Sequence, residues 1–134
     1  GDPSLHHRAV HLFVRNAAGD LFLQKRSENK KIQPGKWDTS VGGHVEAGES
    51  YEDAARKEAA EELGIAPEDT LTMRYSHEYV WRSDVETEHI RTYLLDYEGP
   101  FKLHPAEISE GRFWSIEELK NAVRTGRLTP NLEE

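Results

Sequence analysis

Hydrophobic and polar positions alternate in several short stretches of this chain, and the alternation predicts β-strands. The stretch from residue 7 to residue 15 alternates around Val10, Leu12 and Val14, and the run Leu21 to Arg26 follows it after a turn. Two such runs joined by a short loop are typical of a β-hairpin. The chain is therefore expected to open with two antiparallel strands.

Further strand-like stretches follow along the chain. Trp37 to Val45 is short and leads into a glycine-rich loop, after a polar segment at residues 27–36 that is predicted to be a surface loop. The later stretches alternate in the same way and are bounded by polar or Gly-Pro turns: Leu71 to Arg82, His89 to Tyr97 and a short last strand at Phe113 and Trp114.

A helix is predicted between these strands, from Tyr51 to Leu63. Ser50 can cap its N-terminus with Asp53 three residues later, and Gly64 followed by Pro67 forms a stop signal. The length expected for this segment is normal for a helix of a globular domain.

A second helix is predicted from Ser115 to Thr125, where Glu118 stands three residues after an N-capping serine. The side chains expected to face the core are those of Ile116, Leu119 and Val123. The order β-β-β-α-β-β-β-α predicts an α/β (α+β) fold, with helices on the faces of a sheet, and excludes a bundle or an all-β sandwich. All 134 residues are assigned to one domain.

Acidic residues crowd onto one side of the first predicted helix. Glu58, Glu61 and Glu62 stand at i, i+3 and i+4, and Glu58 and Glu62 fall beside the apolar stripe of that helix. Like charges so placed repel one another, and Mg²⁺ or Mn²⁺ with oxygen ligands would compensate them. The alternative is a solvated acidic face on which Arg56 and Lys57 are the partners.

The loop before this helix is rich in glycine. Gly42, Gly43 and Gly48 allow the backbone to approach a ligand closely, and a loop rich in N–H groups before a helix N-terminus favours phosphate. The first two glycines are therefore candidates for substrate binding, and Glu46 in the same loop is a candidate outer metal ligand. Trp37 is assigned either to the core or to a wall of the substrate pocket.

Composition narrows the class of function. The chain has no cysteine, which excludes thiol catalysis, thiolate metal sites and a disulfide framework. Its net charge of −8 argues against binding a long nucleic acid, although a small diphosphate stays compatible if a metal supplies positive charge. No apolar run of membrane-spanning length and no signal peptide are found, so a cytoplasmic protein is expected.

The two ends of the chain add two minor expectations. Residues 1–4 are interpreted as a cloning remnant, and residues 128–134 as the start of a helix that has been cut short. The sequence does not decide the oligomeric state, and a homodimer is one of the two alternatives, with a monomer as the other.

The region from the glycine loop to the end of the first helix resembles a known signature. Gly43, five residues, Glu49, seven residues and then Lys57-Glu58-Ala59-x-Glu61-Glu62-x-Gly64-Ile65 are similar to the signature of the Nudix hydrolases, which cleave nucleoside diphosphates linked to another moiety. The pattern is long and has many fixed positions, so it is strongly specific. The clear departure is Lys57, where the family has arginine.

The resemblance implies a fold and a set of roles. The fold is an α/β/α sandwich with a mixed curved sheet between helices, and the glutamates matching Glu58, Glu61 and Glu62 hold Mg²⁺ or Mn²⁺. One of them, or a downstream carboxylate such as Glu107 or Glu110, takes a proton from water. Glu58 and Glu62 are expected to be the firmest ligands, and Glu61 the alternative base. Lys57 supplies charge to the substrate-binding region without the planar fork of an arginine, which predicts weak or specialised hydrolysis.

Other residues resemble the branch related to isopentenyl diphosphate isomerase. They are the stretches Leu5 to Ala9, Gln24 to Ser27, Pro34 to Asp38 and Gly42 to His44. This likeness implies a second metal site formed by His7, His44, Glu86 and Glu88. The isomerase also needs a cysteine where this chain has Gly42, and a hydrogen atom cannot replace an acid/base group, so isomerase activity is disfavoured.

Three hypotheses follow. The leading one is a metal-dependent hydrolase that cleaves a pyrophosphate bond in a nucleoside diphosphate derivative or another small diphosphate. The second is an isomerase acting on isopentenyl diphosphate, and the third is a non-catalytic sensor that binds a diphosphate. The choice of substrate depends on loops and aromatic walls, for which Trp37, Tyr79 and Trp81 are the candidates.

Overall fold

The computed structural model of the protein describes residues 6–26, 35–82, 87–104, 108–123, 125, 127 and 128. Glu86, named above as a candidate ligand, and Glu107, named as a candidate base, lie outside the described residues, as does most of the predicted surface loop. The elements in chain order are β1 (His6–Arg15), β2 (Leu21–Arg26), β3 (Trp37–Asp38), β4 (Val41–His44), α1 (Tyr51–Leu63), η1 (Pro67–Thr70), β5 (Arg74–Arg82), β6 (Thr87–Asp96), β7 (Ile108–Trp114) and α2 (Ile116–Ala122).

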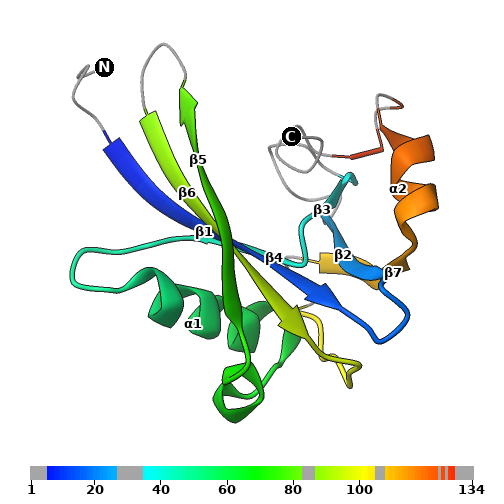
Figure 1. Cartoon of the computed structure of the whole chain (residues 1–134), viewed down its shortest axis with the longest axis horizontal. Coiled ribbons are helices and arrows are strands. Elements are labelled where there is room, and N and C mark those ends of the chain that lie inside the picture. Colours follow the sequence, from blue (N-terminus) through cyan, green and yellow to red (C-terminus); the bar gives the residue numbers. More distant parts are fainter. Residues whose placement is uncertain are drawn as a thin grey trace.

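The sheet is mixed and is organised around β1 (Figure 1). Along one edge β1 pairs in parallel with β6, and along the other it pairs antiparallel with β4 and β2. The strand order is β3-β2-β1-β6-β5, with β4 also pairing with β1 and β7 with β2. The predicted mixed sheet with helices is confirmed.

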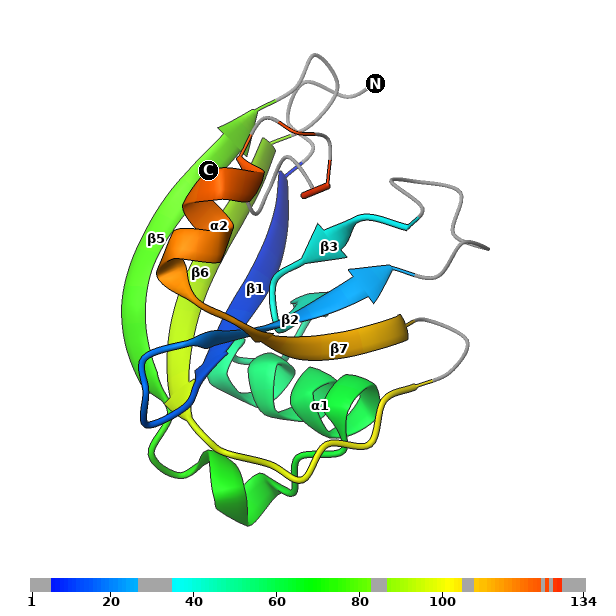
Figure 2. The same cartoon turned by 90° about the vertical axis from the view of Figure 1, so that its right-hand side faces the viewer.

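Two apolar clusters lie on the two sides of this sheet. The larger is formed by the inward side chains of β1, including Val10, Leu12 and Val14, against Ala55 and Leu63 of α1. The smaller lies between β2, β3, β7 and α2. Figure 2 shows the same arrangement from the side, with α1 along one face of the strands and α2 over the other.

The boundaries of α1 agree with the prediction because both of its end signals are local. The Ser50 side chain accepts a hydrogen bond from the backbone N–H of Asp53, and Gly64 has a positive φ of 69° at the C-cap. Only glycine adopts that conformation without a steric cost, so the helix ends there. The helix therefore presents its glutamates at the spacing expected from the sequence.

The prediction of a single strand from Trp37 to Val45 is wrong, because the structure divides this segment into β3 and β4. β3 pairs with β2, whereas β4 pairs with β1, and the chain changes partner between them. At the crossing, the Ser40 hydroxyl accepts a hydrogen bond from the Val14 N–H at 2.8 Å and donates one to the Phe22 carbonyl. A buried side chain thus satisfies backbone groups that the interrupted ladder leaves free.

Three other strand boundaries differ from the prediction. The 3-10 helix η1 ends at Thr70 and a turn closed by a hydrogen bond from the Met73 N–H to the Thr70 carbonyl follows it, so β5 begins at Arg74 rather than at Leu71. β6 spans Thr87–Asp96, and β7 begins at Ile108, five residues before the predicted Phe113. Pairing with neighbouring strands extends β6 and β7 beyond the residues whose own pattern is strongly alternating.

The second helix is shorter than predicted and faces the core differently. It ends at Ala122, and its capping box between Ser115 and Glu118 is present as expected. Ile116 and Val123 are 48% and 42% exposed, whereas Ala122 is buried and Leu119 packs against the smaller cluster. The prediction that Ile116 and Val123 face the core is wrong. Within the described residues, no helix is long and apolar enough to cross a membrane.

Candidate active site

Glu62 lies near the C-terminal end of α1 and is held in a largely buried position. The Gln24 side chain on β2 donates a hydrogen bond from Nε2 to Glu62 Oε1 at 2.6 Å, and the same nitrogen donates to the Ser40 carbonyl at 3.0 Å. The backbone N–H of Gly42 on β4 also donates to the Glu62 carboxyl group. Residues from β2, β4 and α1 therefore converge on one carboxyl group.

Burial dominates the electrostatics of this carboxyl group. Loss of solvent raises the pKa of Glu62 from 4.5 to about 8, and a hydrogen bond and charge repulsion from Glu58 add to the increase. The hydrogen bonds from Gln24 and Gly42 act in the opposite direction but are outweighed. The pair formed by Glu58 and Glu62 therefore carries a negative charge that the surrounding protein only partly compensates.

Gly42 and Gly43, which were predicted to lie in a loop, are part of β4, and Glu58 packs directly on Gly43. A Cβ atom placed on Gly43 would lie 2.5 Å from Glu58 Cγ and 2.7 Å from Glu58 Cδ, so the glutamate occupies the space that any other residue would fill. At Gly42 the same atom would lie 3.6 Å from His11 Cδ2 and from Thr39 Oγ1, which is ordinary contact. A side chain therefore fits at Gly42, whereas at Gly43 it fits only if Glu58 moves.

The other two predicted acids are arranged differently. Glu61 on α1 and Glu46 in the loop are both exposed, so the structure brings Glu58 and Glu62 together but does not bury Glu61 or Glu46 with them. In the part of the chain that the structure describes, no group of three or more His, Asp or Glu side chains is arranged to hold a metal ion. The pair formed by Glu58 and Glu62 is therefore the centre of the candidate site.

Lys57 contacts the glycine loop rather than the pair formed by Glu58 and Glu62. Its Nζ lies 3.1 Å from Glu49 Oε2, and Glu49 Oε1 accepts a hydrogen bond from the Glu46 N–H at 2.9 Å. These contacts, with the Glu46 hydrogen bond the largest, lower the pKa of Glu49. The lysine thus holds the loop to α1 by one charged contact.

Trp37 is 7% exposed and packs against Trp114, with ring centroids 5.2 Å apart. Trp37 was assigned either to the core or to a wall of the substrate pocket, and the structure places it in the core. Tyr79 on β5 is partly buried, and its hydroxyl lies 3.4 Å from His11 Nδ1.

The four residues predicted for a second metal site are only partly described. His44 Nε2 lies 3.7 Å from Glu88 Oε2, and the His7 and His44 rings are 6.2 Å apart, while Glu86 lies outside the described residues. Of the downstream carboxylates, Glu110 is exposed on β7 opposite Lys25, so it lies within the last strand rather than before it.

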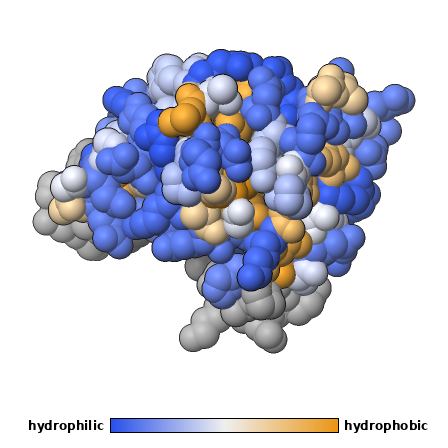
Figure 3. Space-filling model, turned by 90° about the horizontal axis from the view of Figure 1, so that it is seen from below, coloured by the Kyte–Doolittle hydropathy of each residue, from blue (hydrophilic) through white to orange (hydrophobic). Residues whose placement is uncertain are grey.

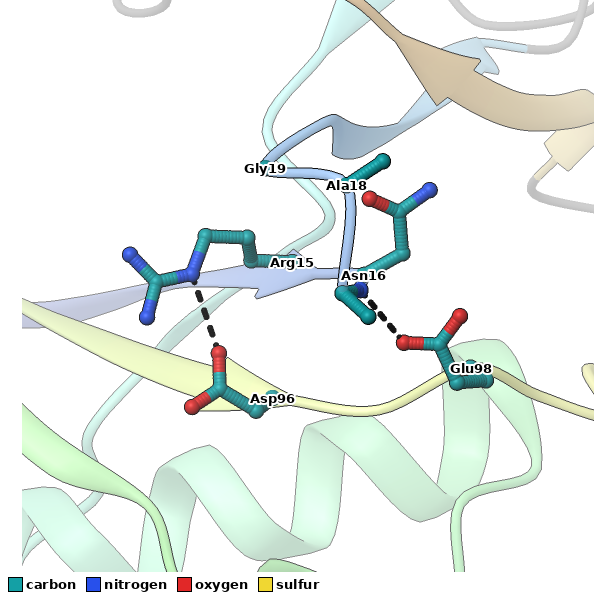
Figure 4. Close-up of a pocket in the computed structure, with 7 residues that line it drawn as sticks. Arg15, Asn16, Ala18, Gly19, Asp96 and Glu98 are labelled. Carbon is teal, nitrogen blue, oxygen red and sulfur yellow. Dashed lines mark hydrogen bonds and ion pairs between the residues drawn. The ribbon is translucent and has the colours of Figure 1, made fainter.

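A surface hollow of about 530 Å³ lies elsewhere, at the turn between β1 and β2 (Figure 4). Its acids already have partners, because Asp96 pairs with Arg15 at 3.0 Å and Glu98 accepts a hydrogen bond from the Ala17 N–H at 2.6 Å. None of the predicted site residues lines it. Figure 3 views the molecule from the side on which α1 and η1 lie, and that face is mostly hydrophilic with a few separate hydrophobic spots.

Sequence reasoning missed two residues that support the site. Gln24 was recognised only as part of a strand end, although it is 8% exposed and contacts Glu62. Arg8 on β1 donates hydrogen bonds to the carbonyls of Glu46 and Glu49 at 3.0 and 3.2 Å. The only signal for Gln24 is its place directly after the apolar residues Leu21 to Leu23 of the same strand, and the sequence gives no signal for the partners of Arg8.

Comparison with known proteins settles the family. The sequence model of the NUDIX domain matches residues 5–132 of this chain. The chain belongs to the Nudix family. A Nudix hydrolase of Deinococcus radiodurans is 34% identical over 128 residues, which cover 93% of this chain and 74% of the relative.

Other Nudix proteins are similar to this chain in sequence or in structure. An uncharacterised Nudix hydrolase of Yersinia pestis is 34% identical over 127 residues, covering 95% of this chain and 67% of its own length, and one of Pseudomonas aeruginosa is 34% identical with 61% of its length covered. The crystal structure of DR0079 from Deinococcus radiodurans superposes with a TM-score of 0.82 at 32% identity, over 98% of this chain and 83% of that one. A MutT NUDIX hydrolase of Burkholderia pseudomallei has a TM-score of 0.78 at 20% identity, covering 96% and 94% of the two chains, and shows the shared fold. These Nudix relatives support the prediction that the chain is a hydrolase.

The raised pKa of Glu62 predicts how the stability of the metal-free protein depends on pH. The folded chain holds this proton up to about pH 8 and the unfolded chain only to about 4.5, so this contribution to stability is complete below 4.5 and is lost as the pH rises to about 8. In EDTA, the melting temperature of the parent relative to Glu62→Gln should fall by about 5 °C between pH 5 and pH 8.5. Calorimetric melts of both proteins measure this difference, and parallel pH curves would contradict it.

Proposed function

We propose that this Nudix protein is a metal-dependent hydrolase of the pyrophosphate bond in a nucleoside diphosphate derivative or another small diphosphate. The observation that carries the proposal is the pair of carboxyl groups, the largely buried Glu62 and the half-buried Glu58, against the two glycines of β4. In an ordinary structural role, a largely buried carboxyl group with a raised pKa, hydrogen-bonded to a second acid, is a cost to folding. A divalent cation bound between the two carboxyl groups and an anionic substrate would offset this cost and give the pair a function.

The donor atoms suit a hard divalent cation. Glu58 and Glu62 offer carboxylate oxygens, and Mg²⁺ is commonly bound through one or two carboxylates together with water and substrate phosphate oxygens. A site with two protein ligands is consistent with the absence of larger groups of His, Asp and Glu side chains in the described part of the chain. We therefore assign the role of metal ligand to Glu58 and Glu62, with Mg²⁺ or Mn²⁺ as the ion.

The remaining roles follow from position. When bound, the ion would lower the pKa of the attacking water and neutralise charge on the leaving phosphate. The water oxygen forms a new bond to phosphorus, the bridging P–O bond breaks, and the proton of the water passes to a carboxylate oxygen. Glu61 is exposed one helical turn from Glu58 and is the candidate for that proton. The backbone at Gly42 and Gly43 allows phosphate to approach, and Glu46 is proposed as an outer ligand.

Incubation with candidate substrates tests this function. The protein should hydrolyse at least one member of a panel of nucleoside triphosphates, nucleotide sugars, dinucleoside polyphosphates and prenyl diphosphates when Mg²⁺ or Mn²⁺ is present, and none in EDTA. Ion-exchange chromatography of the products measures the release of phosphate, pyrophosphate or monophosphate. Tight binding of Mn²⁺ and of an intact diphosphate without turnover would instead establish the non-catalytic sensor.

The likeness to the isopentenyl diphosphate isomerase branch supports a narrower, second proposal. We propose that His7, His44 and Glu88 would form a second metal site together with Glu86, and the 3.7 Å contact between His44 and Glu88 supports this proposal. Incorporation of deuterium from D₂O into isopentenyl diphosphate would reveal isomerase chemistry, and we expect none because Gly42 carries no acid/base group. A cytoplasmic location and a homodimer stay predictions.

A further inference from the structure

The loop between β4 and α1 is fastened to the sheet by one side chain from β1. Arg8 Nη2 donates to the Glu46 carbonyl at 3.0 Å and Arg8 Nη1 donates to the Glu49 carbonyl at 3.2 Å, so one guanidinium group spans both ends of the turn. The backbone of the same residue accepts a hydrogen bond from the Val45 N–H at 2.9 Å. The planar fork of arginine allows this two-point contact, which an ammonium group cannot reproduce.

The guanidinium group is itself held in place. Its central carbon lies 5.4 Å from the centroid of the Tyr51 ring, at the first residue of α1, and Arg91 of β6 lies over the same ring at 4.3 Å. Arg91 in turn pairs with Glu78 on β5 at 3.5 Å. Cation–π contacts of this kind restrain both the arginine and the start of the helix.

The fastened loop is connected to the acidic turn of α1. Glu49 lies at the end of the loop held by Arg8, and its carboxylate pairs with Lys57 at 3.1 Å. Lys57 directly precedes Glu58, whose side chain lies against Gly43. A shift of the loop would therefore move Glu49 and, through it, Lys57, the residue next to Glu58. Gly43, on which Glu58 packs, lies in β4 and pairs with Val10 of the strand that carries Arg8.

We propose that Arg8 is a positioning residue, which holds the loop between β4 and α1 against the helix and supplies from β1 the two-point contact that Lys57 cannot make. The inference rests on the proposed function, since Glu58 is the group being positioned. This role of Arg8 explains how the loop between β4 and α1 keeps one conformation although position 57 is a lysine. It also assigns a role to a residue outside the stretch from Gly43 to Ile65 that carries the signature.

Kinetics of Arg8→Lys test this role. We expect kcat to fall about 10-fold with KM changed less than about twofold, and the affinity for Mn²⁺, measured by calorimetry, to fall about 10-fold, because partners that orient ligands commonly have effects of this size. Lys57→Arg in the Arg8→Lys background should restore most of both losses by returning a forked contact to Glu49. Arg74→Lys is the matched control, since Arg74 is an exposed arginine that pairs with Asp96 at 3.3 Å.

The alternative is that Arg8 only stabilises the fold. In that case Arg8→Lys would lower the melting temperature but leave the kcat and the Mn²⁺ affinity of the folded protein unchanged. Alternatively, Lys57→Arg would restore neither loss in the Arg8→Lys protein. Either result overturns the proposal. If Arg8→Lys does not fold, Tyr51→Leu, which removes the ring beneath the guanidinium, must show the same loss of Mn²⁺ affinity. A parent protein that binds Mn²⁺ without hydrolysing anything overturns the proposed function but leaves the Mn²⁺ measurement as a test of Arg8. A parent that binds no Mn²⁺ overturns both.

Discussion

Glu62→Gln is expected to lower kcat for pyrophosphate hydrolysis about 10²- to 10³-fold, the range seen when one group that stabilises developing charge is removed. The amide keeps the shape of the side chain, and its oxygen can still accept the hydrogen bond that Gln24 Nε2 donates at 2.6 Å. What is lost is the negative charge beside Glu58. Steady-state kinetics at saturating Mg²⁺, with Mn²⁺ affinity from calorimetry, measure the effect.

The stability of this variant separates a lost ligand from a damaged fold. Because the neutral amide removes the buried charge, Glu62→Gln should have the lowered kcat yet, in EDTA above pH 8, be more stable than the parent. Glu68→Gln, an exposed acid in η1, serves as the control and should change kcat less than about twofold. Full activity of Glu62→Gln with unchanged Mn²⁺ binding would refute the assignment of Glu62 as a ligand.

Gly43→Ala is the second substitution with a large expected effect. The added methyl group would lie 2.5 Å from Glu58 Cγ, so the glutamate must leave its position. We expect kcat to fall about 10²-fold. The accompanying loss of stability should be about 1–3 kcal/mol, as for other overpacked sites. Kinetics and urea unfolding of the same preparations measure the two effects.

The neighbouring glycine provides the comparison. Gly42→Ala places its methyl group 3.6 Å from His11 and Thr39, in ordinary contact, and should cost less than about 1 kcal/mol of stability. If Gly42→Ala and Gly43→Ala unfold alike and Gly43→Ala keeps its activity, the position of Glu58 in this structure is not the one used in catalysis.

The parts of the fold that were predicted correctly depend on short-range signals. The Ser50 cap, the left-handed Gly64 and the i, i+3, i+4 spacing of the glutamates all lie within α1 or next to it, so the sequence contains the information needed. Ser40 shows the opposite case, because its hydroxyl satisfies backbone groups of two strands that the chain has already left. A local pattern of alternation cannot reveal such a crossing.

The same distinction applies to the candidate site. The acids on α1 could be named from spacing, but their environments could not: Glu62 is buried by Gln24, which is 38 residues away in sequence, whereas Glu61 is exposed. The wrong assignment of Ile116 and Val123 to the core has a related cause. α2 has only seven residues, and its buried side chains are those that contact the cluster around Trp114. The periodicity of the helix itself does not decide which of its residues are buried.

The central position of β1 has a consequence for how the chain is made. Its parallel partner begins at Thr87, opposite His6, and ends at Asp96, opposite Arg15. During synthesis, β1 can pair early with β2, but the edge that pairs with β6 stays open until the residues of β6 have been translated. A nascent chain interrupted before β6 would thus expose an apolar strand edge, the kind of surface that chaperones bind.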